Sequence, residues 1–109
     1  MLSKLLKRIE RAWHKQGIDL SIKSTRTGIY LERIVIPEET RGQGIGSKIV
    51  RSILKIADNQ HKIAFVYPTD LYGLSWARIN RFYARLGFIY NHSKHLRTLG
   101  YNYMYREPK

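Results

Sequence analysis

The spacing of apolar residues predicts a helix and two strands in the first third of the chain. Apolar residues recur every three or four positions, with basic residues between them, at Leu2, Leu5, Leu6, Ile9 and Trp13. Gly17 is a suitable end for this helix. Residues 18–23 alternate between apolar and polar, residues 24–28 are typical of a turn, and residues 29–36 predict a second strand, which Pro37 ends. We expect the two strands to form a hairpin.

The rest of the chain predicts two more helices and three more strands. Apolar residues follow a helical period up to about Asn59, and residues 63–67 form a continuous apolar run that predicts a strand buried on both faces. A third helix is predicted from Trp76 to Leu86, with Gly87 at its C-terminal end. Residues 88–90 predict a strand, residues 91–98 a basic loop, and the alternating Tyr101, Tyr103 and Tyr105 a closing strand.

This order of elements predicts one α/β domain over residues 1–109, with helices packed on a mixed sheet. A strand, a helix and another strand normally form a right-handed crossover, so the strands at 29–36 and 63–67 should be parallel. A length of 109 residues supports a single modest core.

Composition excludes several kinds of site. The chain has no cysteine, which rules out disulfides, thiolate metal sites and a cysteine nucleophile, and no metal site is predicted. No apolar run approaches the roughly 18 residues of a membrane span. The basic first segment contains Glu10 and is followed by Asp19, so we interpret it as a folded helix and not as a transit peptide.

The charge is strongly positive. Twenty lysines and arginines against eight acidic residues give a net charge of +12. The positive electrostatic field of such a chain favours an anionic partner: nucleic acid, a phosphorylated cofactor or an acidic protein. A protein with a basic surface and no such partner would have the same composition.

Residues 40–50, TRGQGIGSKIV, place three glycines before a predicted helix. The spacing fits neither G-x-x-x-x-G-K-[ST] nor G-x-G-x-x-G, the two common nucleotide signatures, and leaves R-x-x-G-x-G from Arg41 to Gly46. The first turn of a helix carries unpaired N–H groups and a partial positive charge, so it attracts anions. Gly44 and Gly46 would let a phosphate approach these groups, and Arg41 would add charge.

Two segments resemble the GNAT superfamily of N-acetyltransferases. Residues 34–48, IVIPEETRGQGIGSK, are similar to the family's acetyl-CoA-binding segment, and residues 81–88, RFYARLGF, are similar to its A-x-x-F-Y-x-x-L-G-F segment. The resemblance implies that the two central parallel strands splay apart and that acetyl-CoA lies in the gap. It implies the following cofactor-binding residues: Ile34, Val35, Ile36, Arg41, Gly42, Gln43, Gly44, Ile45, Gly46 and Ser47.

The resemblance also implies catalytic roles. Tyr83 occupies the position of the tyrosine that protonates the leaving sulfur, and the backbone N–H near Val35 would polarise the thioester carbonyl. Glu32 lies where some members place a general base. The alternatives for this base are an ordered water and three histidines: His61, His92 and His95.

Several further residues are candidates for contacts with the substrate or the cofactor. Asp70 follows the second central strand and is placed to hold a cationic substrate or simply to make a turn. The basic residues Lys48, Arg51 and Lys55 share a helical spacing, and either Lys48 or Arg51 is a candidate to meet the ribose phosphate, while a solvent-exposed basic face explains the same spacing. Trp76 stands where many family members have asparagine.

The function predicted from the sequence is acetyl transfer from acetyl-CoA to a primary amine by direct attack, in a cytoplasmic monomer or homodimer of a bacterium or an infected host. Two alternatives remain open. One is a basic module that binds nucleic acid through its charge and its eight tyrosines. The other is a GNAT-fold protein that binds acyl-CoA without turnover.

Overall fold

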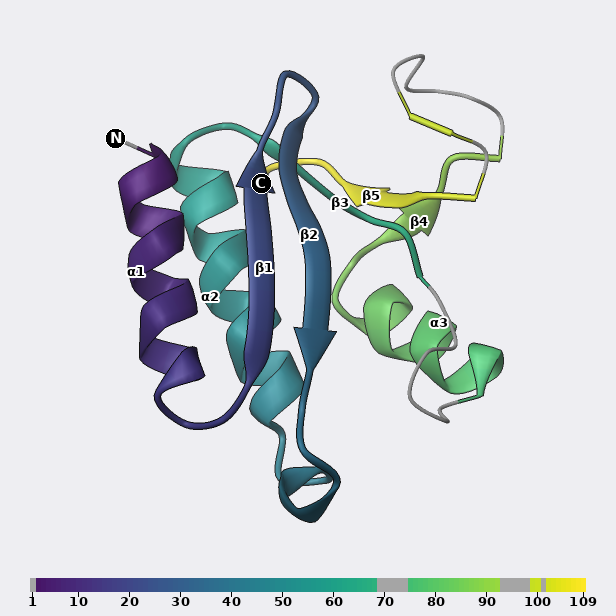
Figure 1. Cartoon of the computed structure of the whole chain (residues 1–109). Coiled ribbons are helices and arrows are strands. Elements are labelled where there is room, and N and C mark those ends of the chain that lie inside the picture. The colour runs from purple at the N-terminus through teal and green to yellow at the C-terminus, as the bar shows by residue number, and fades with distance from the viewer. Residues whose placement is uncertain (1, 69–74, 93–98, 101) are drawn as a thin grey trace.

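The computed structural model describes residues 2–68, 75–92, 99–100 and 102–109. Five strands form one mixed sheet in the order β1-β2-β3-β5-β4, with helices packed against it (Figure 1). The elements in chain order are α1 (Leu2–His14), β1 (Asp19–Ser24), β2 (Gly28–Val35), the 3-10 helix η1 (Glu38–Thr40), α2 (Ile45–Asn59), β3 (Ile63–Val66), α3 (Trp76–Arg85), β4 (Ile89–Tyr90) and β5 (Met104–Arg106).

The first helix and the hairpin form as the apolar pattern predicts. Leu6 of α1 is buried, and it belongs to the same core cluster as Leu20 and Ile22 of β1. The strands β1 and β2 pair antiparallel, with an irregularity between Ser21 and Ile22. Glu10 of α1 accepts a hydrogen bond from the backbone N–H of Ile22 at 2.6 Å, which secures the helix to the strand at this irregularity.

The central strands are parallel for only part of their length. Their register runs from Gly28 opposite Ile63 to Leu31 opposite Val66. A Cβ atom on Gly28 would lie 2.1 Å from the carbonyl oxygen of Ile63, so this close approach of the two backbones requires glycine. The strand β2 continues to Val35 after its pairing with β3 has ended. This divergence is the splay that the resemblance implies.

The two faces of the sheet are filled differently. One face carries the main apolar core, to which α1, α2 and α3 all contribute. The other face carries a smaller aromatic cluster of Tyr30, Phe65, Tyr103 and Tyr105 with Leu99. Tyr30 and Phe65 stack with ring centroids 4.9 Å apart and an interplanar angle of 11°.

Two details of the predicted elements were wrong. The closing strand β5 begins at Met104, so Tyr103 precedes it, while Tyr101 lies outside the described residues. The strand β3 ends at Val66, and Tyr67 is 45% exposed and not buried. The segment after Pro37 forms the 3-10 turn η1. None of the helices in the described ranges is both long enough and apolar enough to cross a membrane.

Candidate cofactor cleft and active site

A cleft of about 860 Å³ opens where β2 and β3 diverge. Its walls come from the end of β2, the glycine segment, the first turn of α2, the end of β3 and one face of α3. Segments that are far apart in the sequence therefore share one hollow, and its lining includes eight of the ten predicted cofactor-binding residues: Ile34, Ile36, Arg41, Gly42, Gly44, Ile45, Gly46 and Ser47.

The glycine segment adopts a backbone that favours glycine. Gly42 and Gly44 have φ angles of 83° and 76°, in the left-handed region. A Cβ atom on either would meet nothing within 4 Å, so the space in front of them is open. Gly44 is the N-cap of α2 and supplies no side-chain hydrogen bond to the helix. The first N–H groups of α2 therefore lack a side-chain cap, and this end of the helix suits an anion.

Gly46 has a different reason to be glycine. A Cβ atom there would lie 3.3 Å from Cδ1 of Ile36 and 3.4 Å from Cζ of Phe82. A side chain at this position would therefore press on Ile36 and Phe82, both of which line the cleft. Glycine allows the first turn of α2 to lie close to Ile36 and to Phe82 of α3.

Arg41 braces the glycine segment in addition to contributing charge. Its Nε donates a hydrogen bond to the carbonyl of Ile36 at 2.9 Å. This bond joins the segment to the end of β2. It also occupies the carbonyl of Ile36, one of the residues that the resemblance assigns to cofactor binding.

Tyr83 reaches the cleft from α3 and is 9% exposed. Its ring makes edge contacts with Phe82 and Phe88, at centroid distances of 5.0 and 5.4 Å. Burial raises the pKa of its phenol to about 12. The hydroxyl therefore stays protonated at neutral pH and is available as a hydrogen-bond donor.

Glu32 lines the same cleft from β2 and is exposed. Its Oε1 accepts a hydrogen bond from the hydroxyl of Ser21 at 2.6 Å. A carboxylate and a protonated phenol thus lie on the walls of one cavity. This pair is able to accept a proton from one reacting group and to donate a hydrogen bond to another.

Sequence reasoning missed three cations of this cleft: Arg33 on β2, and Arg78 and Arg85 on α3. Arg78 and Arg85 lie with Phe82 at intervals of four and three residues, which places these three on one side of the helix. The same helical spacing, applied to the arginines as well as to the apolar residues, would have identified Arg78 and Arg85. The three missed arginines add positive charge to a cleft that already contains Arg41.

Several predicted residues lie elsewhere. Val35 and Gln43 do not line the cleft, and neither do His61, His92 or Lys48. His61 occupies the turn after α2 with a positive φ of 53°. Asp70 and His95 lie outside the described residues. Trp76 contacts Tyr90 and does not face the cleft.

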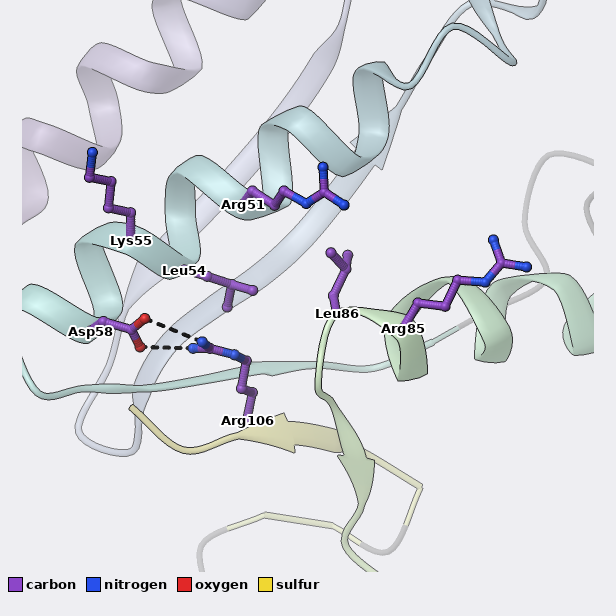
Figure 2. Close-up of a pocket in the computed structure, with 7 residues that line it drawn as sticks. All are labelled: Arg51, Leu54, Lys55, Asp58, Arg85, Leu86 and Arg106. Atoms are coloured by element: carbon purple, nitrogen blue, oxygen red, sulfur yellow. Dashed lines mark hydrogen bonds and ion pairs between the residues drawn. The ribbon is translucent and has the colours of Figure 1, made fainter. Parts of the chain in front are cut away.

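A second, shallower hollow of about 340 Å³ lies between α2, the end of α3 and β5 (Figure 2). Arg106 and Asp58 form an ion pair across it at 2.8 Å. Figure 2 shows the side chain of Lys55 on the opposite side from those of Arg51 and Arg85, so the three do not point toward a common site. This hollow therefore has basic edges without a converging set of donors.

The described residues contain no group of three or more histidine, cysteine or acidic side chains able to hold a metal ion. For an acyl-CoA, by contrast, the fit is good. The uncapped end of α2 and three arginines suit phosphates, and the apolar side chains of Leu31, Ile34 and Val66 suit an aliphatic arm.

Comparisons with known proteins also indicate an acetyltransferase. Residues 16–90 match the model of the acetyltransferase (GNAT) domain. A stretch of 43 residues is 51% identical to the thialysine N-epsilon-acetyltransferase of Sus scrofa, over 38% of this chain and 25% of the pig protein. A chain in the crystal structure of a KacTA–DNA complex is similar in fold, with a TM-score of 0.52 at 22% identity, over 83% of this chain and 55% of that one. This chain therefore spans only a part of each relative.

Proposed function

The chain belongs to the GNAT family of acetyltransferases, and from this membership we propose that it transfers an acetyl group from acetyl-CoA to a primary amine. The observation that carries the proposal is the single cleft that joins the uncapped N-terminus of α2 with Tyr83 and Glu32. A site for a phosphorylated donor and a pair of groups for proton handling thus lie on the same walls.

The donor would be held by backbone and by arginine. The first N–H groups of α2, from Ile45 to Ser47, would bind the pyrophosphate, with Arg41, Arg78 and Arg85 as counter-charges. The end of β2 near Ile34, which pairs with β1 but not with β3, would face the pantetheine arm. When bound, acetyl-CoA supplies the acetyl group as a thioester and leaves as the thiol.

The side chains of the cleft would then move the protons. Glu32, which lines the cleft, would accept a proton from the ammonium form of the acceptor, directly or through a water, and so make the amine a nucleophile. Tyr83, which lines the same cleft, would donate a hydrogen bond to the sulfur as negative charge develops on it. No covalent enzyme intermediate is required, in keeping with the absence of cysteine.

The name of the pig relative suggests the first acceptor to test. Thialysine carries a primary amine at the end of a flexible chain, and the local identity of 51% falls on 38% of this chain. We therefore place thialysine and lysine at the head of an acceptor panel.

Calorimetry with acetyl-CoA tests the donor site. We expect micromolar binding to the parent protein and a loss of at least about 30-fold in Gly44→Trp, because the indole would fill the space in front of the helix end. Gly44→Ala is the matched control. It has the same strained φ of 76°, but its Cβ meets open space, so binding should stay within a few-fold of the parent.

Absence of acetyl-CoA binding in the parent would refute the proposal. Binding without thiol release on any amine of the panel would instead support the alternative, a GNAT-fold protein that holds acyl-CoA without turnover.

A further inference from the structure

Three aromatic side chains stack outside the cofactor cleft. Trp76 at the start of α3 stacks on Tyr90 of β4, with ring centroids 5.9 Å apart and an interplanar angle of 18°. Tyr90 also stacks on His92, at 4.7 Å and 15°. None of the three residues lines the cleft. The proposed acetyl transfer therefore leaves this near-parallel set of rings without a role.

Hydrogen bonds hold the hydroxyl of Tyr90 and the backbone that carries Trp76. The Nδ2 of Asn80 donates to the backbone carbonyl of Trp76 at 2.7 Å. The Oδ1 of the same amide accepts a hydrogen bond from the hydroxyl of Tyr90. In addition, Ser75 caps α3 by accepting from the N–H of Arg78 at 3.2 Å. One side chain, Asn80, thus connects the ring of Tyr90 to the backbone of Trp76.

The outer ring of the stack is open. Trp76 is 55% exposed, although burial of a large aromatic side chain would stabilise the fold. Within the described part of the chain, its ring contacts one other ring, that of Tyr90. Tyr90 itself is partly buried and packs against the main core. The stack therefore rests on the core at one place and presents an indole face to solvent at another.

Charge narrows the class of ligand. The chain has a net charge of +12. The helix that begins with Trp76 contains three arginines and no acidic residue. A second copy of this chain would be equally basic and would be repelled, whereas a polyanion would be attracted. A positive surface beside exposed aromatic rings is the combination by which proteins bind single-stranded nucleic acid with little sequence preference.

We propose that the stack of Trp76, Tyr90 and His92 is a base-stacking site for single-stranded nucleic acid, with the phosphates held by the surrounding basic surface. A base would lie on the indole face of Trp76, and the phosphates would meet exposed basic residues outside the cleft, such as Arg81 of α3. The proposal does not depend on acetyl transfer, because it concerns residues outside the cleft and a binding event alone.

Tryptophan fluorescence tests the proposal directly. Trp13, the other tryptophan, is partly buried in the core, so Trp13→Phe leaves Trp76 as the sole reporter. The ligands are an oligothymidylate of about 12 nucleotides and an abasic oligomer of the same length and charge. We expect the oligothymidylate to quench Trp76 and to bind roughly 10-fold more tightly than the abasic oligomer, because only the former can stack.

Variants separate stacking from charge. Measured by anisotropy of a labelled oligomer, Trp76→Leu should reduce the affinity for oligothymidylate to that for the abasic oligomer. Ile89→Ala is the matched control. Ile89 is 56% exposed and next to Tyr90 in β4, but it is not aromatic, so its removal should change the affinity less than about twofold. Acetyl-CoA calorimetry on Trp76→Leu, or its circular dichroism if the parent binds no acetyl-CoA, checks that the variant is folded.

Equal affinity of the parent for the two oligomers would overturn the proposal, and so would an unchanged affinity in Trp76→Leu. Light scattering provides a further check. A parent dimer that becomes monomeric in Trp76→Leu would show that the indole face binds a second copy of the chain, which also overturns the proposal.

Discussion

At the scale of single residues, the environment of Tyr83 determines what its hydroxyl can do. The ring lies between Phe82 and Phe88, and burial raises the pKa of the phenol to about 12. An ordinary tyrosine has a pKa near 10 and a thiol of the cysteine type a pKa of about 8.5. Complete proton transfer from Tyr83 to a thiolate is therefore uphill. A hydrogen bond that strengthens as the sulfur becomes negative is the more favourable role.

Replacement of Tyr83 by phenylalanine should affect turnover and not donor binding. We expect kcat to fall about 100-fold, because the hydrogen bond to the departing sulfur is lost. The Kd for acetyl-CoA, measured by calorimetry, should stay within about twofold, since the ring and its packing are retained. A kcat equal to that of the parent would exclude Tyr83 from the reaction.

The raised pKa of Tyr83 also predicts a pH profile. In the proposed reaction the protonated phenol would be the active form, and it persists until the pH approaches about 12. Ionisation of Tyr83 should therefore cause no fall in kcat between about pH 8 and about pH 10.5. The rate of thiol release over this range tests the expectation. A basic limb near pH 10 that disappears in Tyr83→Phe would contradict it.

At the scale of elements, an ion pair joins the end of α2 to the last strand. Arg106 of β5 donates two hydrogen bonds to the carboxylate of Asp58, at 2.8 and 3.2 Å, and the backbone N–H of Lys109 donates a third at 3.0 Å (Figure 2). The Arg106 side chain is 9% exposed and that of Asp58 is 26% exposed. Loss of the carboxylate would leave a buried guanidinium without this partner.

Asp58→Asn should lower the free energy of unfolding by about 1–3 kcal/mol at pH 7. The hydrogen bonds from Arg106 hold the pKa of Asp58 below its ordinary value of 3.8. The stabilisation is therefore present above about pH 4 and is lost as the pH falls through the lower pKa of the folded state. Urea unfolding at pH 7 and near pH 3 should show a difference between parent and variant that shrinks in acid.

Asp19→Asn is the control for this comparison. Its partner Arg33 lies at 2.9 Å, but the side chains of the pair are 47% and 51% exposed. Solvent screens such a pair, so the variant should lose less than about 1 kcal/mol. Equal losses in the two variants would show that burial does not distinguish the two ion pairs.

Also at this scale, the sequence predicts elements better than the contacts between them. The helical and alternating periods come from local spacing, so α1, α2, α3 and the β1–β2 hairpin were predictable. Other features depend on how distant segments pack. They are the irregularity in β1 at Ser21, the ion pair between Arg106 and Asp58, and the end of the β2–β3 pairing at Leu31. The splay was predictable only from the resemblance of two motifs to a known family.

The candidate site likewise contains parts that were predictable from local sequence and parts that depend on packing. Arg41 to Ser47 form a contiguous motif, and most of its members line the cleft. Arg78 and Arg85 lie on another helix and reach the cleft only in the folded chain. The stack of Trp76, Tyr90 and His92 unites two segments separated by a helix, and no local pattern indicates it.

At the scale of the whole molecule, the net charge of +12 acts on stability as well as on binding. Like charges repel most strongly in the compact state. Added salt screens this repulsion, with a Debye length of about 8 Å at 0.15 M ionic strength. We expect the Tm to rise when NaCl increases from about 20 mM to about 300 mM, as measured by differential scanning calorimetry. The rise should shrink when Lys4 and Lys7, exposed on α1, are both replaced by glutamate. A Tm that falls with salt would indicate that attractive ion pairs dominate.

The divergence of β2 from β3 leaves an edge strand in the middle of a sheet. Beyond Leu31 the backbone of β2 has no partner on β3, whose last residue is Val66. Unpaired strand backbone is a template on which another chain can add as a strand, and this route leads to aggregation. An acyl-CoA in the cleft would cover this backbone and block such additions. Its binding would therefore protect the protein from self-association at the same place where it would supply the acetyl group in the proposed reaction.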